Sequence, residues 1–178
     1  MTWWLGEMAP FDCESTGIDT EAARIVTTTV AHITPNAETE VSSHLIAVDV
    51  EIPVEATEVH GITTEHARAN GKPAGEVLEA VAAQLAEVMA NGTPVVGMNL
   101  QYDFTLLDRE LRRNALPTLD TRLGRPIGPV VDIYVIDKAL DKYRKGGRKL
   151  VDMCAAYGAR IDEAHEATAD ALAAARVA

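Results

Sequence analysis

Residues 24–34, with the sequence RIVTTTVAHIT, decide the fold class. This run is continuous and rich in β-branched residues, which is typical of a strand buried on both faces of a sheet. Residues 39–48 (TEVSSHLIAV) follow a Pro35-Asn36 turn signal and are predicted to form its antiparallel neighbour. Residues 4–13 are predicted to form a third strand. Pro10 indicates a local break or bulge in that strand, because proline cannot donate to a sheet ladder.

The rest of the chain alternates helical and short extended patterns. Residues 75–92 are predicted to be a helix that ends at Gly92, and their apolar positions share one face (77, 78, 81, 85, 88 and 89). Residues 55–63 (EATEVHGIT) are predicted to lie in a loop. The remaining predictions are strands at 93–99 and 128–134 and helices at 101–114, 138–143, 150–158 and 168–178. This order predicts an α/β fold with a mixed five-stranded sheet flanked by helices.

Length and composition predict one soluble globular domain over residues 1–178. The chain is 47% hydrophobic and 24% charged, and its longest apolar runs carry Glu and are too short to span a bilayer. The first ten residues lack a basic, then apolar, signal-peptide pattern. The two cysteines, Cys13 and Cys154, indicate no disulfide framework. We therefore expect a cytoplasmic protein with no membrane partner.

Two carboxylates lie two residues apart in PFDCESTG. Asp12 and Glu14 would project from the same face of a strand, with Cys13 on the opposite face. Two adjacent carboxylates repel each other unless a cation lies between them, although a pair of solvent-facing acids at a turn remains the simpler interpretation. The small residues Ser15, Thr16 and Gly17 favour the metal site, because they allow backbone amides to approach a phosphate or sugar.

Three further polar residues lie in two later segments. Asp103 in NLQYDFTLL follows a predicted strand end, where ligands gather in open α/β sheets, although it could simply complement a helix dipole. Asn99 could orient such a site, but we favour an N-cap role. Thr168 is the predicted N-cap of the last helix and places Asp170 in its first turn, with His165 in the preceding loop. There His165 could act as a general base, or be an ordinary surface histidine.

Together these segments resemble the DEDDh family of 3′→5′ exonucleases, within the ribonuclease H-like superfamily. Asp12-x-Glu14, Asp103 and His165-x4-Asp170 resemble the three family motifs in order. The resemblance covers about residues 8–175, and the spacing is most similar to the epsilon proofreading subunits of bacterial DNA polymerase III.

The resemblance implies a site for two ions, Mg²⁺ or Mn²⁺, bound by Asp12, Glu14 and Asp170, with Asp103 in support. His165 would take the proton from the attacking water. Ser15, Thr16, Glu55, His60 and Asn99 would contact or orient the terminal nucleotide. The implied activity is hydrolysis at the 3′ end of single-stranded or frayed DNA, releasing nucleoside 5′-monophosphates, with a DNA polymerase as a possible partner. An RNA-trimming enzyme and a non-catalytic module of a replication or repair assembly are the alternatives.

The net charge of −11 argues against a broad basic surface for nucleic acid. Bound cations would offset several of the negative charges, and a local basic stretch is present at 141–150 (DKYRKGGRKL). Two interpretations of this stretch remain open: a solvated loop hinged on glycines, or a loop that contacts phosphates.

Overall fold

The computed structural model describes residues 5–35, 37–161 and 167–178. Five strands and eight helices are formed by these residues. In chain order they are β1 (Ala9–Ser15), β2 (Ile25–His32), β3 (Glu40–Leu45), α1 (Val54–His60), α2 (Thr64–Asn70), α3 (Ala74–Ala90), β4 (Val95–Gly97), α4 (Leu100–Arg113), α5 (Leu119–Leu123), β5 (Val130–Asp132), α6 (Ile133–Leu140), α7 (Leu150–Tyr157) and α8 (Ala167–Val177). None of these helices is long and apolar enough to cross a membrane.

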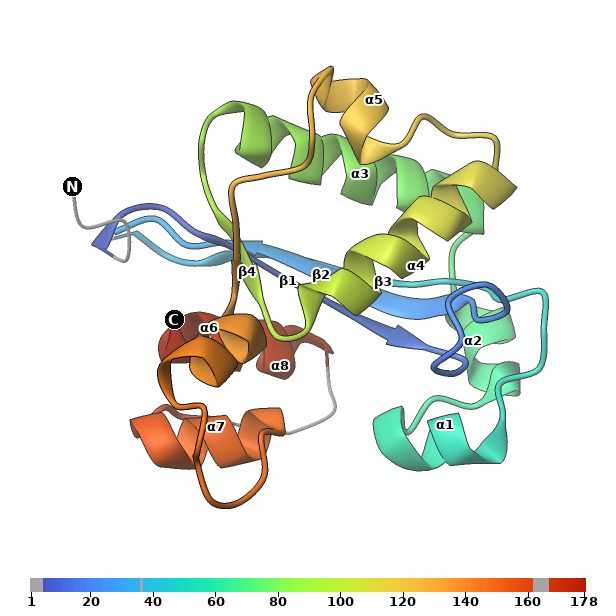
Figure 1. Ribbon diagram of the computed structural model, residues 1–178. Coiled ribbons are helices and arrows are strands. Elements are labelled where there is room, and N and C mark those ends of the chain that lie inside the picture. Colours follow the sequence, from blue (N-terminus) through green and yellow to red (C-terminus); the bar gives the residue numbers. More distant parts are fainter. Residues whose placement is uncertain (1–4, 36, 162–166) are drawn as a thin grey trace.

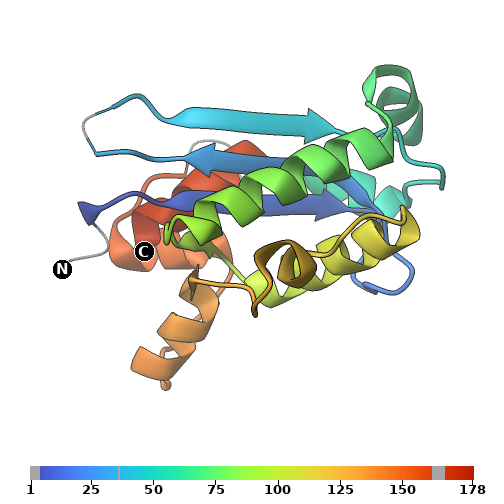
Figure 2. The same cartoon turned by 90° about the horizontal axis from the view of Figure 1, so that it is seen from above.

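The strands form one mixed sheet in the order β3-β2-β1-β4-β5. β2 runs antiparallel to β1 and β3, and β1, β4 and β5 are parallel. Helices α3, α4 and α5 cover one face of the sheet, and α6, α7 and α8 lie on the other, as Figure 1 and the view from above in Figure 2 show. This arrangement confirms the predicted fold class, a ribonuclease H-like α/β sheet flanked by helices.

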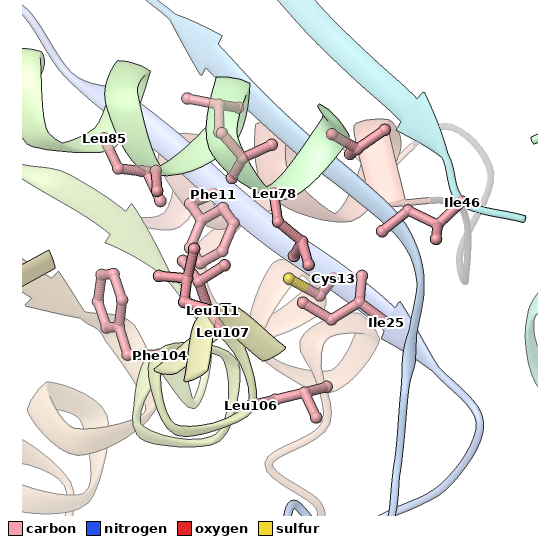
Figure 3. Close-up of a cluster of buried hydrophobic side chains, with 14 of the residues drawn as sticks. Phe11, Cys13, Ile25, Ile46, Leu78, Leu85, Phe104, Leu106, Leu107 and Leu111 are labelled. Carbon is pink, nitrogen blue, oxygen red and sulfur yellow. The ribbon is translucent and has the colours of Figure 1, made fainter. Parts of the chain in front are cut away.

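Alternation along β1 separates the core from the polar face. Phe11 and Cys13 are buried among the side chains of α3 and α4, including Leu78 and Leu107, as Figure 3 shows. Asp12 and Glu14 consequently project from the opposite face, where α8 packs. The predicted apolar face of the 75–92 helix is confirmed, because all six of its positions are buried.

The strand boundaries differ from the prediction at Pro10. β1 begins at Ala9 and continues to Ser15. Ala9 and Pro10 pair with β4 but not with β2, and the pairing with β2 keeps its register across them, since Met8 pairs with Ile33 and Phe11 with Val30. The register shift comes later, between Glu14 and Ser15. The missing amide of Pro10 therefore interrupts pairing locally, while the bulge lies beside the acidic residues, where it changes the direction of the chain.

Several helices differ from the prediction. The 55–63 loop instead contains most of α1, and the strand predicted at 128–134 ends at Asp132. Asp132 caps α6 by accepting hydrogen bonds from the amides of Tyr134 and Val135, which starts that helix at 133 rather than 138. Thr168 is not an N-cap, because α8 already includes Ala167. Its hydroxyl group instead contacts the hydroxyl groups of β2 and β3 side chains.

Candidate active site

Three carboxylates come together where β1 meets the start of α8. Asp12 and Glu14 project from β1, and Asp170 lies in the first turn of α8, as the sequence predicts. One carboxylate oxygen from each residue lies within 4.8 Å of the other two, and all three side chains are half-buried. Residues 158 positions apart in the chain are thereby brought into one group.

The geometry and chemistry of this group fit a divalent cation. Mg²⁺ binds oxygens at about 2.0–2.1 Å, so ligand oxygens on opposite sides of the ion lie roughly 4 Å apart. The observed spread of up to 4.8 Å is close to that arrangement and closes with small side-chain movements. The three ligands would all be carboxylate oxygens, and such a donor set suits Mg²⁺ and Mn²⁺ better than it suits Zn²⁺.

Asp103 lies next to this cluster and is held by the backbone of β1. It is in the first turn of α4 with only 4% of its surface exposed, and its Oδ1 accepts a hydrogen bond of 3.1 Å from the amide of Cys13. Burial raises the pKa of the Asp103 carboxyl to about 7, and the charge of Asp132 adds to the rise, while backbone amides oppose it. Asp103 is not one of the three clustered carboxylates among the described residues. It contacts the amide between the two acidic residues of β1.

The predicted base, His165, lies outside the described residues, as do residues 162–164 and 166. Its role therefore rests on its spacing from Asp170 in the sequence.

The loop after β1 is fixed by a tyrosine that the sequence analysis did not identify. The hydroxyl group of Tyr102 donates to the carbonyl of Gly17 and lies 2.7 Å from Oγ of Ser15. The Thr16 hydroxyl accepts the amide of Arg24 at 2.9 Å, and this closes the base of the loop. The predicted substrate residues Ser15 and Thr16 thus use their side chains within the protein. An aromatic residue directly before Asp103 was the available signal for Tyr102.

Beside Glu14 lies a cavity of about 500 Å³, which the loop after β1 and helix α1 line together. Glu55 and His60, the two predicted nucleotide contacts, are both in its wall, and Ile18 and Val59 contribute apolar surface. Burial lowers the pKa of His60, partly opposed by hydrogen bonding to the Ser15 backbone, and His60 Nδ1 accepts the amide of Ile62. A neutral imidazole is therefore favoured there at pH 7.

Asn99 occupies the N-cap position of α4, but the predicted capping hydrogen bond is absent. Its backbone is left-handed, with φ of 62°, and no side-chain hydrogen bond caps the helix. A left-handed backbone does not suit the extended conformation from which cap side chains reach the helix amides. Instead, the Asn99 amide donates to Oδ1 of Asp132 at 3.0 Å, and its side chain is exposed.

Comparisons with known structures identify the same architecture in larger enzymes. Exonuclease I from Methylocaldum szegediense matches with 23% identity and a TM-score of 0.76, covering 97% of this chain and 39% of that one. E. coli exonuclease I in complex with a dA16 oligonucleotide matches with 17% identity and a TM-score of 0.74, covering 96% and 39%. A product-bound exonuclease I matches with 16% identity and a TM-score of 0.79, covering 97% and 42%. The chain therefore spans about two-fifths of the length of these proteins.

No curated protein sequence matches the chain. The sequence model of the RNase_T exonuclease family, in contrast, matches residues 10–178, which include both β1 acids, Asp103 and the whole of α8. Because that match covers nearly the entire chain and the structure groups three of its acidic side chains, the protein belongs to this exonuclease family.

Proposed function

We propose that this protein is a metal-dependent 3′→5′ exonuclease acting as a single domain over residues 1–178, and that it removes nucleotides from single-stranded or frayed DNA. The observation that carries the proposal is the group formed by Asp12, Glu14 and Asp170, whose oxygens lie within 4.8 Å of one another. Family membership supports exonuclease chemistry, and oligonucleotide complexes of the similar exonuclease I support a DNA strand as substrate.

Each acidic residue has a proposed role. Asp12, Glu14 and Asp170 would hold Mg²⁺ or Mn²⁺, and Asp103 would support a second ion while fixing the β1 backbone through Cys13. When bound, the cations would stabilise the negative charge on the attacking and leaving oxygens. His165 would accept the proton of the attacking water.

The cavity beside Glu14 is the proposed site of the 3′-terminal nucleoside. Its volume of about 500 Å³ lies within the range of ordinary ligand sites, and its wall includes Glu14, a proposed cation ligand. Ile18 and Val59 would contact the base, while Glu55 and His60 would contact the sugar. Ser15 and Thr16 would contribute through their backbone, and Asn99 through its exposed side chain.

Two alternatives remain to be distinguished by experiment. RNA would be the preferred substrate if the cavity accommodates a 2′-hydroxyl group, which is the feature that separates the two nucleic acids. A non-catalytic module of a replication or repair assembly is disfavoured, because the chain retains all four acids and the histidine. A cytoplasmic location and association with a DNA polymerase complete the proposal.

The decisive experiment is digestion of matched DNA and RNA oligonucleotides, labelled at either end, in Mg²⁺, Mn²⁺ or EDTA. We expect loss of nucleotides from the 3′ end of DNA, no reaction in EDTA, and no reaction by Asp12→Ala. Glu87→Ala is the matched control, because it removes an exposed carboxylate from α3, on the other face of the sheet. Full activity of Asp12→Ala, with folding verified by circular dichroism, would contradict the proposed site.

A further inference from the structure

The segment from α6 to the start of α7 concentrates the basic residues of an acidic protein. Four of the five lysines in the chain lie between residues 138 and 149, although the net charge is −11. All four are exposed, and they are Lys138, Lys142, Lys145 and Lys149. The connection between α6 and α7 lies on the same side of the sheet as α8 and α1 in Figure 1.

The two arginines of this segment point inward and serve a structural purpose. Asp137 on α6 is 2% exposed, and its carboxylate lies 2.8 Å from Nη2 of Arg144 and 2.8 Å from Nε of Arg148. Tyr157 of α7 donates its hydroxyl to the same carboxylate at 2.7 Å, and the Arg144 guanidinium stacks over the Tyr157 ring at 5.1 Å. The loop is therefore fixed to both helices at its two arginines.

Fixing Arg144 and Arg148 leaves the residues between and beside them facing solvent. Tyr143 is 86% exposed, the highest value for an aromatic side chain in the described residues, and Lys142 and Lys145 flank it in the sequence. An exposed aromatic ring between two lysines, on a loop anchored at Arg144 and Arg148, is a combination with which proteins bind single strands: the ring stacks on a base and the amines contact phosphates.

We propose that Lys142, Tyr143 and Lys145 form a second contact site for the single-stranded substrate, upstream of the bond that is cleaved. This inference rests on the proposed exonuclease function. The charge of the site is complementary to the strand, and the rest of the acidic surface would repel it. α6 begins beside Asn99 and its eight residues span about 12 Å, so the loop lies roughly that far from the start of the helix.

The test measures hydrolysis of a long and a minimal substrate by three proteins: wild type, the double variant Lys142→Ala/Lys145→Ala, and Tyr143→Ala. The 20-mer dT20 can reach the loop, whereas the p-nitrophenyl ester of thymidine 5′-monophosphate cannot. We expect both variants to hydrolyse the small ester like wild type but to show a raised KM for dT20. The control Lys72→Ala/Arg112→Ala removes two exposed cations elsewhere, one of them on α4 across the sheet, and separates a local contact from net charge.

Binding of labelled dT20 in EDTA, followed by fluorescence anisotropy, tests the loop independently of turnover. Each phosphate contact on a single strand contributes about −0.7 to the slope of log K against log salt, so the double variant should lose about 1.4 of slope. Between 50 and 200 mM salt, wild type should then lose about sevenfold more affinity than the double variant. Tyr143→Ala should weaken binding about fivefold or more.

The outcomes separate this inference from the proposed function. Equal affinities and salt slopes for wild type, Tyr143→Ala and the double variant would overturn the second contact site, whatever the catalytic result. An equal loss in the Lys72/Arg112 control would also overturn it, because the effect would then reflect net charge. Failure of wild type to hydrolyse either substrate would reject the exonuclease proposal, and the anisotropy result would still decide whether the loop binds a strand.

Discussion

Replacing Asp137 by asparagine tests how far the connection between α6 and α7 depends on one buried charge. The substitution preserves the shape of the side chain and an acceptor for Tyr157, but it removes the negative charge that faces two guanidinium groups. Arg144 and Arg148 would then lie close together without their shared counter-ion. The neutral amide could satisfy only part of their hydrogen bonding.

The expected loss of stability follows from the burial of the three partners. Breaking a fully buried ion pair costs about 3–5 kcal/mol. Arg144 and Arg148 retain 11% and 20% exposure of their side chains, so partial hydration should keep the loss near about 3 kcal/mol. For a chain of this size, about 2–4 °C of melting temperature corresponds to each kcal/mol, which gives a decrease of roughly 6–12 °C.

The pH dependence of stability provides a second, independent test of the role of Asp137. Burial raises the pKa of Asp137, but the hydrogen bonds from Tyr157 and Arg148 and the charge of Arg144 outweigh it, so the pKa lies below its usual value. The stabilisation by the carboxylate is therefore complete above the unfolded pKa of about 3.9 and is lost as the pH falls through the folded value.

Urea unfolding of wild type and Asp137→Asn at pH 7, 5, 4 and 3 measures both effects. The difference in unfolding free energy should be constant from pH 7 to 5 and should shrink below about pH 4. Asp141→Asn is the matched control, since its carboxylate is more exposed and lies 3.6 Å from Arg144. Thermal unfolding at pH 7 completes the test. A melting temperature within about 2 °C of wild type, or a free-energy difference that does not shrink in acid, would refute the reasoning.

Three more predictions concern the cation, the base and the sheet. Mg²⁺ at 100 times its Kd should stabilise the wild type by about 2.7 kcal/mol, raising the melting temperature by roughly 5–11 °C, and an equal shift in Asp170→Asn would exclude Asp170 as a ligand. His165→Ala should lower turnover by about 10²–10⁴-fold while keeping the Mg²⁺-induced shift in melting temperature; unchanged turnover would remove it from the mechanism. Gly97→Ala should lower the free energy of unfolding in urea by about 1–3 kcal/mol, because the added Cβ would lie 2.7 Å from the Phe11 carbonyl oxygen. Gly75→Ala is the control, since its Cβ would meet nothing nearer than 3.8 Å. Equal stabilities of the two variants would contradict the overpacking at Gly97.

The parts of the fold that were predicted correctly are those with long, regular patterns. The β-branched run of β2 and the apolar face of α3 each bury many side chains, and hydrophobic periodicity predicts which side chains are buried. Alternation in β1 was equally informative, because Asp12 and Glu14 lie on one face and Cys13 on the other. Local pattern could not show that Asp170 lies beside them, and the grouping of the three acids was predicted from the family resemblance.

The parts that were missed depend on contacts between distant segments. α1 has seven residues and buries none of them, so it has no apolar stripe, although Gly61 after it adopts the left-handed conformation that ends many helices. Asp137 has the sequence position of an ordinary charged helix residue, and its burial depends on arginines 7 and 11 residues later. Tyr102 binds a loop 85 residues earlier in the chain, a relation that local pattern cannot reveal.

The alanine-rich helix α8 carries Asp170, one of the three clustered carboxylates, and rests on β1, which carries the other two. Attachment of this helix to the sheet therefore also assembles the carboxylate cluster. A cation bound by all three carboxylates, as proposed, would make detachment of the helix less favourable, because detachment would separate the ligands. Scarcity of Mg²⁺ would then do more than slow the chemistry: it would loosen the C-terminal helix and expose the strand beneath it to proteases.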